Sequence, residues 1–218
     1  MEVYRIHIRP KGGLANPQIS FTYCLKEQVL GMGWQTESQV SGISWEEYEK
    51  EAASIYGDGE LSRVRYLKHN VKKDDLLWTR DTESNYYLGK VLSGWEYVTN
   101  SDAQKADITN IVRCKLVRVP SVDDVPGKVV ASFRPSRTIQ GIRDNTASDY
   151  SIYLWNKITG TTDYATSPRK YENVFSFLDS EETEDVVFIY FQTKGWIVVP
   201  NSRKADTMSH NAPGKRVA

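Results

Sequence analysis

Cysteine and histidine are scarce in this chain. Two cysteines, Cys24 and Cys114, and three histidines among 218 residues provide no cluster with the spacing of a zinc site. We therefore assign no metal and no cofactor. We expect both cysteines to be buried free thiols in a reducing compartment, and a disulfide between them is the alternative.

Long apolar runs are also missing. No run reaches the ~18–20 residues that cross a bilayer, and the first residues lack the basic and apolar regions of a signal peptide. These absences predict a cytoplasmic protein with no membrane partner.

Net charge is missing too, because 28 basic residues balance 28 acidic ones. The charges are nevertheless segregated. Residues 113–143 contain seven basic and two acidic residues, whereas residues 171–185 contain six acidic residues and no basic one. Such segregation permits a nucleic-acid-binding face on a neutral protein. Solvated charge on exposed strands and a linker predicts the same pattern.

Short segments rich in aromatic and β-branched residues are abundant in the first part of the chain, and they predict an α+β fold dominated by strands. Residues 19–29 fit either a strand or a short helix. Ser44 and Glu47 form the pattern of a capping box at the start of a helix. The other expected elements are strands at 3–8, 74–80, 86–92, 95–98 and 111–119, helices at 44–55 and 62–69, and a turn at 81–85. This meander predicts a small mixed β-barrel with flanking helices.

The second part of the chain has a different pattern. Residues 128–137 are interpreted as a linker, and 138–156 as a helix with apolar residues on one side. An acidic helix at 173–193 is expected to end at Gly195, and a strand is expected at 196–200. We therefore divide the chain into a barrel at 1–127, the linker, a smaller helix-rich α/β segment at 138–207, and a disordered tail at 208–218.

The order of elements up to residue 127 resembles the EVE and YTH-like domains of the PUA superfamily. The resemblance is carried by the segments KKDDLLWTRDTESNYYLGKV and IVRCKLVRVPSVDDVPGK, in which Asp75–Trp78 and Leu88–Val91 occupy the places of two core-strand motifs. It implies a barrel that binds nucleic acid and holds a flipped, modified base in an aromatic cage.

The segment EETEDVVFIYFQTKGWIVVPNSRKADT resembles the opening of a PD-(D/E)XK-type nuclease domain of restriction and defence proteins. The resemblance implies that Glu182 or Glu184 takes the place of the helix glutamate of that family. Only eleven residues follow Thr207, and none of them is acidic. Two-metal hydrolysis needs several converging carboxylates. We therefore expect no working nuclease from this chain unless a partner subunit completes it.

Two indoles stand beside glycines, where the backbone can approach another group closely. Trp34 follows Gly31 and Gly33, and Trp95 follows Gly94. A base cage needs two or three aromatic walls and a polar group for the base edge. The candidate pocket residues are Trp34, Trp95, Trp78, Tyr87, Asp81 and Asn85. The alternative, which we favour for Trp78, is that these aromatics fill the core.

Basic residues supply the candidate phosphate contacts. Arg113, Lys115 and Arg118 stand on one expected strand, and we expect them to share a face that contacts phosphate groups. Arg80 at the pocket mouth and Arg137 in the linker extend this set. Exposed solubilising charge is the alternative.

The sequence therefore predicts a nucleic-acid recognition module, not a complete enzyme. Its expected partner is DNA or RNA, with DNA carrying a flipped base favoured, in a restriction or antiviral defence context. One alternative is a subunit or truncated form of a metal-dependent restriction-type endonuclease. Another is a protein-interaction component that pairs with a nuclease or other effector subunit.

Overall fold

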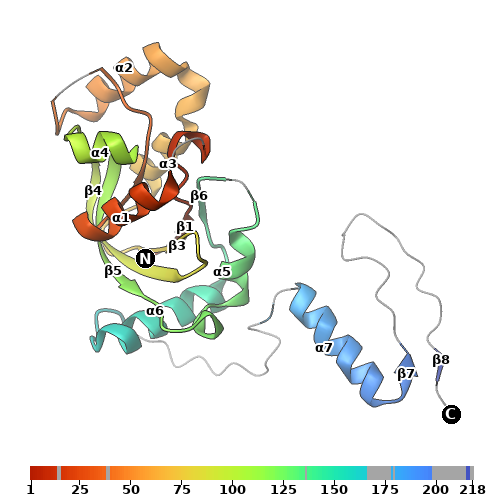
Figure 1. Cartoon of the computed structure of the whole chain (residues 1–218). Coiled ribbons are helices and arrows are strands. Elements are labelled where there is room, and N and C mark those ends of the chain that lie inside the picture. The colour runs from red at the N-terminus through yellow and green to blue at the C-terminus, as the bar shows by residue number, and fades with distance from the viewer. Residues whose placement is uncertain are drawn as a thin grey trace. The chain divides into compact units, whose positions relative to one another are not determined.

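The structure is a computed structural model that describes residues 1–13, 16–37, 40–135, 137–165, 178, 180–197 and 215–216. The chain divides into two compact units, Met1–Pro168 and Arg169–Ala218. The first unit contains a six-stranded mixed sheet in the order β2-β5-β4-β3-β1-β6, with helices on both faces (Figure 1). The expected α+β class is confirmed. The expected closed barrel is not, because β2 and β6 are the two edges of an open sheet.

The elements of the first unit alternate irregularly along the chain. Its strands are β1 (Val3–Ile6), β2 (Val29–Met32), β3 (Leu76–Arg80), β4 (Tyr86–Tyr97), β5 (Asn110–Arg118) and β6 (Ile139–Gly141). Its helices are α1 (Pro17–Glu27), α2 (Trp45–Tyr56), α3 (Ser62–Asn70), α4 (Ser101–Ala106), α5 (Gly127–Ser132) and α6 (Asn145–Thr159), with 3₁₀ turns η1 (Pro10–Gly13), η2 (Asp58–Leu61) and η3 (Val122–Asp124). Strands β1 and β3 are parallel, and every other adjacent pair in this sheet is antiparallel.

Local sequence signals explain where the early helices begin. Asn16 caps α1, accepting a hydrogen bond from the backbone N–H of Gln18 at 2.9 Å, and Pro17 occupies the first turn. The ambiguous segment 19–29 is therefore mostly helix, and β2 follows it. The capping box of α2 is confirmed, since Ser44 and Glu47 exchange side-chain hydrogen bonds with each other's backbone N–H groups.

Strand alternation divides the core between the two faces of the sheet. One core lies under α1 to α4 and includes Leu77, whereas the other lies under α5 and α6 and includes Leu76 and Trp78. Trp78 is fully buried there, and its indole N–H donates a hydrogen bond to Ser151 Oγ at 2.9 Å. Trp78 is therefore a core residue, which is the alternative favoured for it from the sequence, and it is removed from the candidate base pocket.

The region expected to be a linker is part of the fold. Residues 127–132 form α5, and Val129 and Phe133 are buried against the sheet. The segment 138–156 is not one helix either, because β6 (Ile139–Gly141) pairs antiparallel with β1 before α6 begins. The edge of β1 has backbone N–H and C=O groups that need hydrogen-bond partners. Pairing with this edge therefore favours a strand over a helix at residues 139–141.

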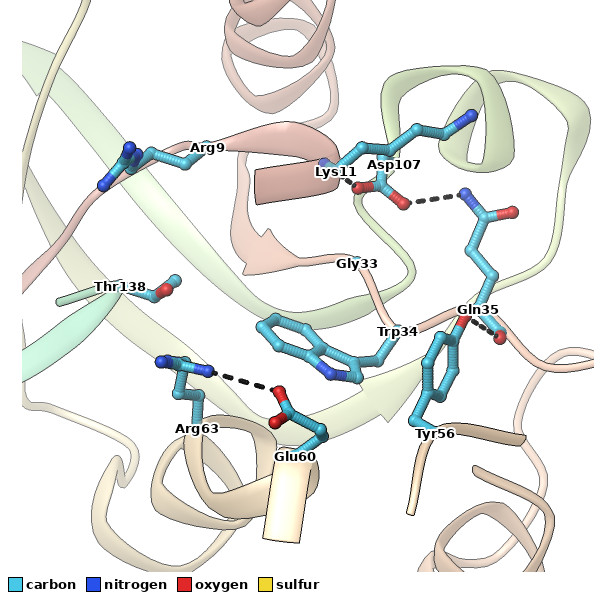
Figure 2. Close-up of a pocket in the computed structure, with 10 residues that line it drawn as sticks. All are labelled: Arg9, Lys11, Gly33, Trp34, Gln35, Tyr56, Glu60, Arg63, Asp107 and Thr138. Atoms are coloured by element: carbon cyan, nitrogen blue, oxygen red, sulfur yellow. Dashed lines mark hydrogen bonds and ion pairs between the residues drawn. The ribbon is translucent and has the colours of Figure 1, made fainter. Parts of the chain in front are cut away.

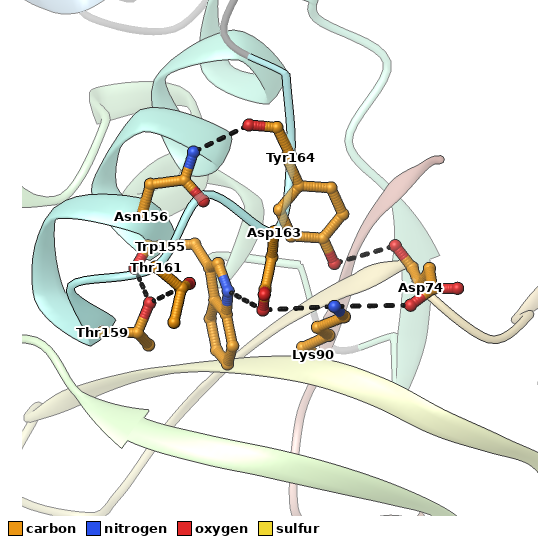
Figure 3. Close-up of polar contacts among 8 residues, drawn as sticks. All are labelled: Asp74, Lys90, Trp155, Asn156, Thr159, Thr161, Asp163 and Tyr164. Atoms are coloured by element: carbon orange, nitrogen blue, oxygen red, sulfur yellow. Dashed lines mark hydrogen bonds and ion pairs between the residues drawn. The ribbon is translucent and has the colours of Figure 1, made fainter.

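A polar clamp ties the end of α6 and the residues after it to the sheet (Figure 3). Lys90 Nζ lies 3.1 Å from Asp163 Oδ2 and 3.5 Å from Asp74 Oδ1. The indole N–H of Trp155 donates to Asp163 Oδ2 at 3.0 Å, and the hydroxyl of Tyr164 donates to the carbonyl of Asp74 at 2.9 Å. The clamp closes the α6 layer over β3 and β4.

Both cysteines are buried free thiols, as expected. Burial raises the pKa of the Cys24 thiol to about 12 and also raises the pKa of Cys114. Among the helices that the structure describes, none is long and apolar enough to cross a membrane.

The second unit is described in part. Helix α7 (Ser180–Thr193) is followed by Gly195 at φ 79°, and β7 (Trp196–Ile197) pairs antiparallel with β8 (Lys215–Arg216). Strand β8 lies within the tail that was expected to be disordered. The rest of that tail, most of 173–179 and residues 198–200 lie outside the described residues.

Candidate functional site

A cavity of about 750 Å³, here called the Trp34 cavity, is walled by segments that are far apart in the sequence (Figure 2). They are the segment after β1 with η1, the loop after β2, the end of α2 with η2, α3, the residue after α4, and the residue before β6. The lining residues are Arg9, Lys11, Gly33, Trp34, Gln35, Tyr56, Glu60, Arg63, Asp107 and Thr138. This volume is in the range of small-molecule binding sites.

Trp34 is held in an unusual backbone conformation. Its φ is +62°, in the left-handed region that non-glycine residues rarely adopt. The loop is fastened because the carbonyl of Trp34 accepts hydrogen bonds from the hydroxyl of Tyr48 at 2.9 Å and from Asn110 Nδ2 at 3.4 Å. Strained residues of this kind cluster at functional sites.

Asn110 connects this loop to the core. Its buried amide nitrogen donates to the carbonyl of Gly33 and to Tyr48 Oη, the latter at 2.9 Å. Its amide oxygen accepts a hydrogen bond from the indole N–H of Trp95 at 3.0 Å. Trp95 therefore supports the Trp34 loop from the interior and does not wall the same cavity.

The two glycines before Trp34 allow close backbone approach, as the sequence predicted. A Cβ atom at Gly31 would collide with the backbone carbonyl of Asn110, and one at Gly33 would lie 2.6 Å from the carboxylate oxygens of Asp107. That carboxylate accepts hydrogen bonds from the backbone N–H of Lys11 at 2.6 Å and from Gln35 Nε2 at 3.0 Å. Asp107 thus joins three segments of the cavity wall.

Tyr56 supplies a second aromatic group to the Trp34 cavity. Its hydroxyl donates to the carbonyl of Gln35 at 2.7 Å, and burial raises its pKa, so it is a neutral hydrogen-bonding group at pH 7. Arg9, Lys11 and Arg63 bring positive charge to the rim, and Arg63 lies 3.9 Å from Glu60. A flat indole, a phenol ring and these cations suit a planar ligand that carries negative charge.

The structure does not bring the predicted cage residues together. Trp34 lines the cavity described above, whereas Trp95 lines a different cavity of about 360 Å³ and packs edge-on against Trp45 at 5.0 Å between ring centroids. Trp78 is in the core. Tyr87 packs against Phe21 with ring centroids 5.0 Å apart, in the core under α1 to α4.

Asp81 and Asn85 form their own turn. The carboxylate of Asp81 accepts hydrogen bonds from the backbone N–H groups of Glu83 and Asn85 at 2.9 and 2.8 Å, and from Asn85 Nδ2 at 2.8 Å. These bonds stabilise the connection from β3 to β4. In the structure neither side chain belongs to the lining of the Trp34 cavity.

The three basic residues of β5 do not share one face. Arg113 and Lys115 alternate onto the α5–α6 side, whereas Arg118 lies on the other side. Arg113 pairs with both carboxylate oxygens of Glu96. Lys115 Nζ lies 5.9 Å from the ring of Trp155, and Arg118 donates to Asn85 Oδ1 at 2.6 Å. The single basic track expected along β5 is therefore corrected.

Sequence reasoning missed most of the Trp34 cavity. Lys11 follows Arg9 in a turn recognisable from Pro10 and the two glycines after it, but nothing local indicates that this turn faces Trp34. Tyr56 and Arg63 belong to helices whose periodicity predicts packing and gives no sign of a cavity.

No group of three histidine, cysteine, aspartate or glutamate residues that could hold a metal ion occurs in the described part of the chain. No family model matches the sequence, and no characterised protein or solved structure matches it either.

Proposed function

We propose that this chain is a nucleic-acid recognition module that holds one nucleobase in the Trp34 cavity. The observation that carries the proposal is Trp34 itself, a half-buried indole held at positive φ beside a cavity of about 750 Å³. Trp34 supplies a stacking surface, and Tyr56 is the second aromatic group. Arg9, Lys11 and Arg63 suit the phosphates that accompany a base in a polynucleotide.

The resemblance to EVE and YTH-like domains supports the same function by a separate route. The mixed sheet covered by helices belongs to the same α+β class as those domains. That the first unit is a PUA-like domain is part of this proposal. A flipped, modified base of DNA or RNA is the ligand that the resemblance implies. The second aromatic group of the proposed pocket is, however, Tyr56, and not Trp95, Trp78 or Tyr87.

The test is a binding panel measured by fluorescence anisotropy with single-stranded and double-stranded DNA and RNA. Each oligonucleotide carries one unmodified or methylated base, and each titration is run at two salt concentrations. A base reader discriminates among the bases, whereas a backbone binder shows a steep salt dependence and no base preference. The panel also distinguishes DNA from RNA.

Trp34→Gly is the sharpest variant, because glycine adopts positive φ without strain while the indole is removed. Stacking contributes ~1–3 kcal/mol per base, so we expect affinity to fall about 5- to 150-fold, with a small change in melting temperature. Tyr153→Ala is the control, because Tyr153 is an exposed aromatic on α6 that does not line the cavity. Unchanged affinity in folded Trp34→Gly would refute the base pocket.

A second function is favoured by one observation in α7. Val187, Ile189, Tyr190 and Phe191 are all exposed, and Ile189 is 58% accessible. Exposed apolar side chains on a helix are typical of a protein interface. We infer a role as an interaction component, such as a partner of an effector subunit. A chain that purifies as a monomer with no co-purifying protein, with sedimentation unchanged by Ile189→Glu, would argue against this role.

A further inference from the structure

A group of cationic side chains, here called the Arg5 cluster, surrounds Phe133 on the α5–α6 side of the sheet. Arg5 and His7 alternate onto this side of the first strand and its extension, and Arg80 ends β3 on the same side. The Cζ atoms of Arg5 and Arg80 lie 5.4 and 5.0 Å from the centroid of the Phe133 ring, and the His7 ring meets it edge-on at 5.7 Å.

The Arg5 side chain is fully buried, but only some of its N–H donors have hydrogen-bond partners. Its Nη1 donates to the carbonyl of Arg137, whereas Nε and Nη2 have no hydrogen-bond partner among the residues that the structure describes. Burial and the charges of Arg80 and Arg137 lower its pKa to about 10, so it is still charged at pH 7. A buried charge without a counter-ion is costly and is normally compensated by one.

Among the described residues, no acidic side chain forms an ion pair with this cluster, nor with Arg137. Arg80 has one long hydrogen bond, to the hydroxyl of Tyr86 at 3.5 Å. The cluster is therefore a concentration of positive charge in a low-dielectric setting, where its attraction for an anion is poorly screened.

A cavity of about 270 Å³ opens beside the cluster and is lined by His7, Arg9 and Arg80 among others. Its size admits a tetrahedral phosphate group together with water. Asp81 is the acidic residue of the lining, and its carboxylate already accepts the turn hydrogen bonds from Glu83 and Asn85.

We propose that this cavity is an anion site for a phosphate group, contacted by Arg80 and Arg9, with buried Arg5 supplying uncompensated positive charge. Guanidinium groups bind phosphate through paired N–H donors, which is why arginine suits this role. Arg9 also lines the Trp34 cavity, so one side chain borders both cavities. The anion site nevertheless stands independently of the base pocket, because Arg5 and Arg80 do not line the Trp34 cavity.

The first experiment measures the melting temperature of the full chain with increasing inorganic phosphate, at constant ionic strength maintained with chloride. A ligand that binds the folded state raises the melting temperature in proportion to the logarithm of its concentration once the site saturates. We expect this rise in the wild type and in Arg113→Gln, the matched control on β5, because Arg113 pairs with Glu96 and does not line this cavity. We expect its loss in Arg80→Gln.

A second measurement covers the case in which Arg80→Gln weakens the fold by itself. Burial and the nearby charges of Arg5, Arg80 and Arg9 lower the pKa of His7 from 6.5 to about 4, and Asp81 lies across the cavity. A bound anion offsets these positive charges and favours the imidazolium. Histidine NMR signals should therefore show the pKa of His7 rising with phosphate in wild type and Arg113→Gln, and staying unchanged in Arg80→Gln.

Two further ligands identify the source of the phosphate. Thymidylyl-thymidine carries a phosphodiester, and thymidine carries no phosphate. A response to the phosphodiester and to inorganic phosphate, but not to thymidine, assigns the site to a nucleic-acid backbone. A response to inorganic phosphate alone assigns it to a free phosphate.

A phosphate response retained in Trp34→Gly supports the anion site even if the base pocket is refuted. No phosphate-dependent change in melting temperature or in the pKa of His7 overturns the site.

Discussion

Replacement of Asn110 by alanine is the most informative perturbation of the candidate site, because one buried amide fastens the whole Trp34 loop. The variant loses three good hydrogen bonds, with the carbonyl of Gly33, Tyr48 Oη and the indole N–H of Trp95. Each such bond contributes a net ~1 kcal/mol. We therefore expect Asn110→Ala to lower the free energy of unfolding by about 3 kcal/mol. For a chain of this size the loss corresponds to a fall in melting temperature of about 6–12 °C.

The assay is urea unfolding followed by tryptophan fluorescence, with the free energy taken from the midpoint and slope. Asn70→Ala is the matched control, because the exposed Asn70 side chain donates a single hydrogen bond, to the carbonyl of Tyr66 at 3.1 Å. We expect the control to lose less than about 1 kcal/mol. If Asn110→Ala loses no more stability than the control, the network does not hold the loop and the argument for a preformed pocket fails.

The other two predictions concern the α5–α6 side of the sheet. Trp78→Phe should cost about 1–3 kcal/mol in urea unfolding, and Ser151→Ala should cost less in that background than in wild type. Equal costs of Ser151→Ala in both backgrounds would contradict the hydrogen bond. Hydrogen bonds from Trp155 and Lys90 lower the pKa of Asp163 below 3.8, so its contribution is present above pH 3.8 and is lost as the pH falls through the lower folded value. Asp163→Asn should therefore shift the urea midpoint more at pH 7 than at pH 3, and equal shifts would contradict this.

Local signals in the sequence predicted local structure well. The pair Ser44 and Glu47 specified the start of α2, because a capping box satisfies its own backbone groups within four residues. The polar turn from Asp81 to Asn85 between two apolar segments specified the β3–β4 hairpin. These elements depend on neighbours along the chain, so the sequence alone was sufficient to predict them.

Long-range partners overrode local patterns elsewhere. Ile139 to Gly141 fitted a helical periodicity, but pairing with β1 makes them a strand. The expected barrel is not confirmed for a related reason, because closure depends on whether the edges β2 and β6 meet, and no local pattern specifies that. Arg118 was placed with Arg113 and Lys115 although strand alternation already separates it from them.

The sequence by itself determined the α+β class, the capped helices, the central hairpin and the importance of the glycines before Trp34. Those features follow from backbone geometry and from nearest neighbours along the chain. Only the tertiary structure decided that Trp78 lies in the core and that Tyr56 and Arg9 share a cavity with Trp34. It alone also placed Arg5 inside the protein with no acidic partner among the described residues. A cavity and a buried charge are defined by what surrounds them, and here the surroundings come from segments more than a hundred residues apart.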